Sequence, residues 1–152
     1  MSEGTLNNVV RKCYDVLEPF ENRAKELLIS APVEHFDETG MRYEKKLIWV
    51  HTACTSNITL LFPHRRRGGE AMDAFGILPN FQGIAVHDYM KSYYKYACLH
   101  ALCCAHILRE LVFQCEVEKR KWAQEFIVLL RGMHERVEKA KKSGATSRLS
   151  ER

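Results

Sequence analysis

The sequence of 152 residues has no long uninterrupted apolar segment. Its most apolar stretch, residues 101–113, is interrupted by His106, Arg109 and Glu110, and this pattern excludes an ordinary membrane span. The N-terminus is polar and has no apolar segment of the kind that directs secretion, so we expect a cytoplasmic protein. A strong excess of one charge is also missing, because 23 Lys and Arg residues against 19 Asp and Glu residues leave a net charge of +4.

The composition gives no sign of a disulfide framework, although the chain has six cysteines. Without an export signal we expect reduced thiols at all of them, at Cys13, Cys54, Cys98, Cys103, Cys104 and Cys115. Hydrophobic residues make up 46% of the chain and charged residues 28%, which is ordinary for a globular protein of about one domain.

The first half of the chain predicts a helix followed by three strands. Apolar residues recur at helical spacing over residues 5–29, with Pro19 as an expected kink or break. Three runs rich in branched and aromatic side chains then predict strands, at residues 33–38, 47–54 and 58–62. A turn is expected at Thr39-Gly40, and because short polar links join the strands, we expect an antiparallel meander.

The second half predicts alternating helices and strands. In chain order these are a helix, a strand, a short aromatic helix, a strand and a helical region, at residues 70–77, 83–88, 89–96, 98–103 and from 105 onward. A right-handed crossover makes the strand at 83–88 parallel to the first strand. An apolar stripe from Trp122 to Val137 marks a further helix, and the small polar tail is expected to be disordered.

This order of elements is that of a ribonuclease-H-like α/β fold. We therefore divide the chain into a helical lead-in, a core, a helical segment and a tail, at residues 1–30, 31–115, 116–142 and 143–152.

Two aspartates end strand-like apolar runs. Asp37 lies in His-Phe-Asp-Glu-Thr-Gly and Asp88 closes Gly-Ile-Ala-Val-His-Asp. If the two strands are neighbours, the two carboxylates converge and form a site for Mg²⁺ or Mn²⁺, which suits phosphoryl transfer. We expect their carboxylates within about 8 Å, since paired metal ions lie about 4 Å apart. The alternative is that each aspartate only satisfies the amides of a turn.

The motifs around these aspartates resemble one family. The resemblance is carried by segments that occur in the family's order, at residues 31–40, 49–51, 67–73, 76–79, 81–83, 86–88 and 100–111. They are similar to the bacterial insertion-sequence transposases of the sixty-six group, in the DDE superfamily. The similarity runs over residues 15–135, which is most of the chain.

The resemblance implies a catalytic core for DNA transposition, with metal-dependent cleavage and transfer of DNA strands. It assigns Asp37 and Asp88 as the first two acidic residues and as ligands of two Mg²⁺ or Mn²⁺ ions. Glu110 is the candidate for the third acidic residue. The implied partners are transposon ends and target DNA, in the nucleoid region of a bacterial cytoplasm.

Two features of the family are missing from the sequence. Its members place the third glutamate in a later Asn-Asn-x-x-Glu-Arg segment, and they carry a zinc-finger-like region before the core; neither is present. We therefore expect a truncated transposase that is inactive alone, with residues 116–142 as the start of an insertion domain. The alternative is a non-catalytic remnant that binds DNA, associates with itself or joins a full-length transposase.

Basic and aromatic residues are candidates for contacts with DNA. Arg65, Arg66 and Arg67 form a basic loop that suits phosphates, although a solvated turn explains it about as well. His106 is a further candidate. Tyrosines that could stack on unpaired bases, or pack in the core, follow Asp88 at Tyr89, Tyr93, Tyr94 and Tyr96.

Two other kinds of site are weaker alternatives. A zinc site is conceivable with two cysteines and two histidines, at Cys98, His100, Cys103 and His106. A strand that runs directly into a helix would aim these side chains in different directions, which disfavours the site. A thiol nucleophile at Cys103 or Cys104 has no further motif in its support.

Overall fold

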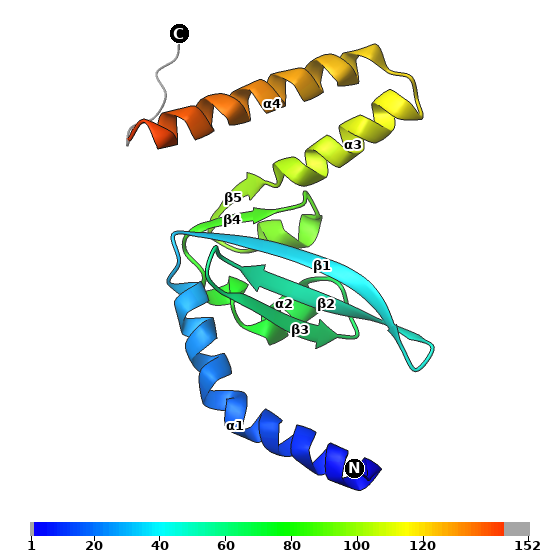
Figure 1. Cartoon of the computed structure of the whole chain (residues 1–152), viewed down its shortest axis with the longest axis vertical. Coiled ribbons are helices and arrows are strands. Elements are labelled where there is room, and N and C mark those ends of the chain that lie inside the picture. Colours follow the sequence, from blue (N-terminus) through cyan, green and yellow to red (C-terminus); the bar gives the residue numbers. More distant parts are fainter. Residues whose placement is uncertain (1, 145–152) are drawn as a thin grey trace. The chain divides into compact units, whose positions relative to one another are not determined.

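The computed structural model describes residues 2–144. The chain divides between Leu102 and Cys103 into two compact units, a sheet unit before this point and a helical unit after it (Figure 1). The tail was predicted to be disordered, and its residues from 145 onward lie outside the described part of the chain. Within residues 2–144, no helix is long and apolar enough to cross a membrane.

The sheet unit is built on five strands in the order β3-β2-β1-β4-β5 (Figure 1). The strands are β1 (Val33–Tyr43), β2 (Lys46–Cys54), β3 (Thr59–His64), β4 (Ile84–His87) and β5 (Leu99–Leu102). β1, β2 and β3 run antiparallel, whereas β4 lies parallel to β1 and β5 parallel to β4. This is the topology of a ribonuclease-H-like fold, and it confirms both the predicted meander and the predicted parallel fourth strand.

β1 is longer than predicted, and the turn expected at Thr39-Gly40 is wrong. The strand continues to Tyr43, and the turn falls at Glu44-Lys45, whose φ angles are 48° and 63°. Gly40 pairs with Trp49 inside the sheet, where an added Cβ would approach the Leu47 side chain to 3.2 Å. The glycine therefore serves close packing on the sheet and not the reversal of the chain.

The sheet unit also contains helical segments, one before the first strand and the others between strands. They are α1 (Glu3–Ile29), α2 (Gly69–Phe75) and two 3₁₀ turns, η1 (Leu78–Asn80) and η2 (Lys91–Lys95). α1 continues through Pro19 and does not end there, and of its residues only Ala24 and Leu28 are buried. The aromatic segment after Asp88 forms only the short 3₁₀ turn η2.

One face of the sheet carries the core. Along β1, Glu34, Phe36 and Glu38 are buried, and their neighbours in sequence point to the opposite face. Helices and turns cover the buried face, and the cluster consists of Leu28, Phe36, Ala53, Met72, Phe75, Ile77, Leu78, Phe81, Ala85, Tyr93, Tyr96 and Cys98. The same alternation therefore decides which acidic side chains of β1 are buried and which reach solvent.

The helical unit is a pair of helices, α3 (Cys104–Glu116) and α4 (Lys121–Lys142). Their contact is centred on Leu111, Ala123 and Ile127. α4 shows a second apolar stripe to solvent, at Trp122, Phe126, Leu129 and Met133. Only part of the predicted apolar stripe therefore packs within this unit.

Glu34 is an acidic residue in the core of the sheet unit. It is fully buried, and neither carboxylate oxygen has a hydrogen-bond partner within residues 2–144. Burial without compensation raises the pKa of Glu34 from 4.5 to about 8. The folded protein therefore binds a proton here at neutral pH, whereas the unfolded chain does not.

We predict that Glu34→Gln removes a pH dependence of stability. Because the pKa of Glu34 is higher in the folded state, the wild-type free energy of unfolding falls as pH rises from 4.5 toward about 8. The fall is at most about 1.4 kcal/mol per pH unit. Urea unfolding at several pH values should show the variant gaining stability over the wild type across this window. The exposed Glu18→Gln is the matched control, and a constant difference between wild type and Glu34→Gln would contradict the prediction.

Candidate active site

The register of β1 and β4 aligns the two aspartates. The strands pair as Val33 with Ile84 and His35 with Val86. Asp37 lies two residues beyond His35, and Asp88 lies two residues beyond Val86. Side chains alternate along a strand, so a register continued by two residues beyond the paired part would give both aspartates the same face and the same level. Their separation stays a prediction, which this register supports.

Hydrogen bonds to the backbone orient both carboxylates. Asp37 is exposed, and its Oδ1 accepts a hydrogen bond from the Glu38 N–H at 2.9 Å. The Asp88 side chain is 21% exposed, and its Oδ1 accepts from the Met90 N–H at 2.9 Å. The Asp88 carbonyl accepts a hydrogen bond from Nδ1 of His87. Each aspartate is thus oriented locally and still reaches solvent.

Glu38, the neighbour of Asp37, points to the opposite, covered face. Its side chain is completely buried. Oε2 accepts a hydrogen bond from the Tyr93 hydroxyl at 2.5 Å, and Oε1 accepts one from Nε of Arg67 at 3.0 Å. The guanidinium of Arg67 also lies 3.6 Å from Oδ2 of Asp88 and stacks over Trp49, 4.9 Å from the ring centre. Arg67 therefore joins the buried acid to the candidate site.

Tyr93 is a buried residue that bonds to Glu38 and is affected by the negative charges around it. Its ring stacks on His87 with 4.3 Å between the ring centres. Burial raises the pKa of Tyr93, and the charges of Glu38, Asp88 and Asp37 raise it further. The phenol therefore stays protonated and donates to Glu38.

A pair of histidines anchors β4 to β5. Nε2 of His87 lies 2.9 Å from Nδ1 of His100, and Nε2 of His100 donates to the Tyr96 carbonyl at 3.1 Å. His87 is fully buried, and this burial lowers its pKa. The residue next to Asp88 is thus held in the core in the same way as the residue next to Asp37.

All three arginines of the basic loop are exposed, but Arg67 also contacts two carboxylates. Arg65 and Arg66 are exposed, and Arg66 has only a long ion pair of 3.8 Å with Glu70. The loop is held by the Arg66 carbonyl, which accepts a hydrogen bond from Nε2 of the buried His51 at 3.2 Å. Arg67 turns back to the carboxylates described above. The three side chains therefore do not act as one patch.

The predicted tyrosine cluster also divides. Tyr93 and Tyr96 are buried in the core, whereas Tyr89 and Tyr94 are 57% and 49% exposed. The Tyr96 hydroxyl donates to Asp73 at 2.9 Å and so ties η2 to α2. Packing explains Tyr93 and Tyr96, whereas Tyr89 and Tyr94 are partly open to solvent, and the ring of Tyr94 also contacts those of His87 and His100.

The remaining candidates lie on α3, in the helical unit. Glu110 is exposed there and His106 is half-buried, and the role of each stays a prediction. Among residues 2–144, no group of three or more His, Cys, Asp or Glu side chains is placed to hold a metal ion. The zinc alternative is therefore not supported, and Cys98 is instead buried in the core of the sheet unit.

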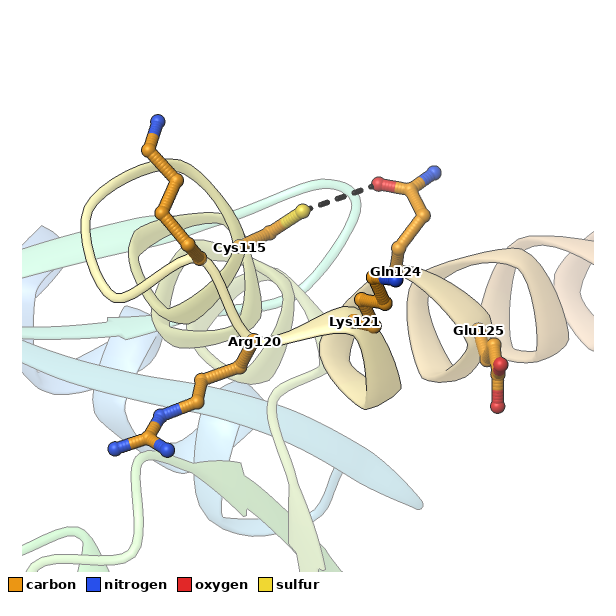
Figure 2. Close-up of a pocket in the computed structure, with 6 residues that line it drawn as sticks. Cys115, Arg120, Lys121, Gln124 and Glu125 are labelled. Carbon is orange, nitrogen blue, oxygen red and sulfur yellow. Dashed lines mark hydrogen bonds between the residues drawn. The ribbon is translucent and has the colours of Figure 1, made fainter.

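Sequence reasoning missed a second basic cluster between α3 and α4. Lys119, Arg120 and Lys121 line a hollow of about 400 Å³. At its edge Sγ of Cys115 lies 3.3 Å from Oε1 of Gln124, and Figure 2 shows Arg120 pointing away from this pair. The cluster is basic, but its labelled side chains do not converge on one point.

The topology of the sheet unit places the chain in a class of proteins, those with a ribonuclease-H-like core. Within this class, the chain belongs to the IS66 family of DDE transposases, because the family model described as "Transposase IS66 family" matches residues 1–152. No curated protein matches the chain in sequence at a significant level.

Two solved structures are similar to part of the chain. One is an intasome of simian T-cell lymphotropic virus in complex with the PP2A regulatory subunit B56 gamma, at 14% identity and a TM-score of 0.38. The other is the HTLV-2 integrase catalytic core domain in complex with magnesium, at 13% identity and a TM-score of 0.36. Each match covers 57% of this chain, and they cover 41% and 74% of the respective relatives.

We predict that Tyr93→Phe destabilises the protein by about 1–3 kcal/mol, since it leaves a buried oxygen of Glu38 without its donor. Urea unfolding should measure this loss. Tyr94→Phe is the matched control, because Tyr94 is 49% exposed, and it should change stability by less than about 0.5 kcal/mol. Equal effects of the two substitutions would show that the hydroxyl of Tyr93 contributes nothing.

Proposed function

We propose that the protein is the catalytic core of a DDE-type transposase, which cleaves and transfers DNA strands with the help of divalent cations. What supports the proposal is the parallel pairing of β1 with β4 in a ribonuclease-H-like sheet, since its register, continued by two residues, would align Asp37 with Asp88. Membership of the IS66 transposase family supports the same function. A chain of this class acts by holding carboxylates and phosphates in fixed geometry.

The donor set of the site fits Mg²⁺ or Mn²⁺. Both ions prefer oxygen ligands, and both aspartates offer carboxylate oxygens that reach solvent. When bound, such an ion would polarise the scissile phosphate and lower the pKa of an attacking water. The backbone hydrogen bonds at Oδ1 of Asp37 and Asp88 limit how far either carboxylate can turn. Glu110 is the proposed third acidic residue.

DNA is the proposed partner, at transposon ends and at target sites. Arg65 and Arg66 are the proposed phosphate contacts, because both are exposed and neither is held by a buried acid. His106 is proposed as a further contact. The protein would act in a bacterial cytoplasm near the nucleoid, alone, with a second copy or with a full-length transposase.

A second candidate function is a non-catalytic DNA-binding or protein-interaction module. It is favoured by the finding that residues 2–144 contain no group of three metal-binding side chains. The exposed stripe of α4 at Trp122, Phe126, Leu129 and Met133 would suit such a role.

We predict that Mn²⁺ binds the wild-type chain and that Asp37→Asn and Asp88→Asn each weaken the binding at least about tenfold, since each removes one charged ligand. Titration followed by the spin resonance of free Mn²⁺ measures this directly. Asp15→Asn, on the exposed α1, is the control. Undiminished binding in both variants would exclude the site.

The same variants separate the two functions. A chain that is inactive alone should not nick labelled duplex DNA with Mn²⁺, whereas nicking that Asp37→Asn and Asp88→Asn abolish would show a complete catalytic core. If Glu110→Gln abolishes it while Glu116→Gln, on the same helix, does not, then Glu110 belongs to the set of acids. Binding of Mn²⁺ and DNA without any nicking would favour the second function.

DNA binding should depend steeply on salt. Each phosphate contact contributes about −0.9 to the slope of log affinity against log salt, so Arg65→Ala with Arg66→Ala should flatten the slope by about 1.8. Fluorescence anisotropy with duplex DNA at several salt concentrations measures it. Arg23→Ala is the control, because Arg23 is paired with Glu26 at 2.7 Å. An unchanged slope would mean that the loop is only a solvated turn.

A further inference from the structure

Arg67 differs from the two arginines that precede it. Its guanidinium lies between two carboxylates, those of Glu38 and Asp88, and over the ring of Trp49. Arg65 and Arg66 are exposed and have no such contacts. Nε and Nη2 of Arg67 are thus engaged by carboxylates, while its side chain remains 45% exposed.

The two ion pairs of Arg67 are unequal. Nε donates to Oε1 of Glu38 at 3.0 Å in hydrogen-bond geometry, whereas Nη2 lies 3.6 Å from Oδ2 of Asp88 as an ion pair. Glu38 is completely buried, and its second oxygen is taken by the Tyr93 hydroxyl. Arg67 is therefore anchored at Glu38, and its contact with Asp88 is the one that can be given up.

This arrangement excludes Glu38 as a cation ligand. Both of its oxygens accept hydrogen bonds, and its side chain has no exposure to solvent. Its charge still acts on the site, because it offsets the positive charge of Arg67 beside Asp88. If Glu38 were removed, the uncompensated positive charge of Arg67 would repel a cation bound at Asp88. If Arg67 were removed, the uncompensated negative charge of Glu38 would attract the same cation.

We propose that Arg67 is a positioning residue of the cation site and not a DNA contact: anchored by Glu38 and Trp49, it holds Asp88 and lowers the affinity of the site for a divalent cation, and Glu38 limits this effect. The inference rests on the proposed function, since it needs a cation at Asp37 and Asp88. It assigns opposite consequences to the loss of two residues that bond to each other.

The test is a Mn²⁺ titration at fixed pH and ionic strength, followed by the spin resonance of free Mn²⁺. Arg67→Gln should tighten Mn²⁺ binding about tenfold, the effect of one charge at about 6 Å from a divalent ion in water-like surroundings. Glu38→Gln should weaken it by a similar factor. The double variant should return close to the wild-type affinity, and Arg67→Lys, which keeps the charge, should stay within about twofold of it. Arg66→Gln is the matched control and should change nothing.

Each other result overturns the inference. If Arg67→Gln and Glu38→Gln both weaken Mn²⁺ binding, Arg67 only supports the structure. If Arg67→Gln leaves Mn²⁺ affinity unchanged and lowers DNA affinity as Arg66→Gln does, Arg67 is a DNA contact. Circular dichroism checks that each variant is folded. If Arg67→Gln unfolds because Glu38 is left buried without its cation, the double variant, which removes both charges, still gives a decisive result. A wild type without Mn²⁺ binding overturns the proposed function and the inference together, whereas binding lost in Asp88→Asn but unaffected by Arg67→Gln overturns the inference alone.

Discussion

The buried carboxylate of Glu38 is the interaction on which the site depends. Its two hydrogen bonds join β1 to η2 through Tyr93 and to the loop before α2 through Arg67. A buried charge is costly unless it is paired and fully hydrogen-bonded, so Glu38 requires both partners in place. Segments far apart in the sequence thereby acquire one fixed arrangement around the two aspartates. Glu34, four residues earlier on the same face, has no partner within residues 2–144 and meets the same cost by holding a proton.

Because side chains alternate along a strand, neighbouring residues of the candidate site have different roles. Glu38 and His87 are buried, whereas Asp37, next to Glu38 in sequence, is exposed, and Asp88 follows His87 directly after the end of β4. The inward residues fix the backbone from which the outward ones project. In such a site, the side chains that orient the backbone of the functional residues are themselves buried.

Much of the fold could be predicted from the sequence because its signals are local. Runs of branched residues, turn residues and apolar periodicity indicated the meander, the crossover to β4 and the helices that follow. Gly40 misled the prediction, because a glycine can serve either a turn or close packing and only the partner strand decides. The role of Arg67 could not be predicted, since its partner Glu38 is distant in sequence and three consecutive arginines look alike. The acid after Asp37 was the available signal, because alternation places Glu38 on the covered face, where a charged carboxylate requires hydrogen-bond donors or a cation.

The pairing of β1 with its two neighbours has a consequence for local unfolding. β1 pairs with β2 along nearly all of its length, from His35 to Tyr43, but with β4 only from Val33 to His35. Asp37 and Asp88 each lie two residues beyond the last paired residues of the shorter of these two pairings. Partial opening of this short pairing would separate Asp37 from Asp88 while the meander stays intact, so amide hydrogens of β4 should exchange with solvent sooner than those of β2. Bringing the two aspartates together would then depend on this short pairing, and the meander could persist without it.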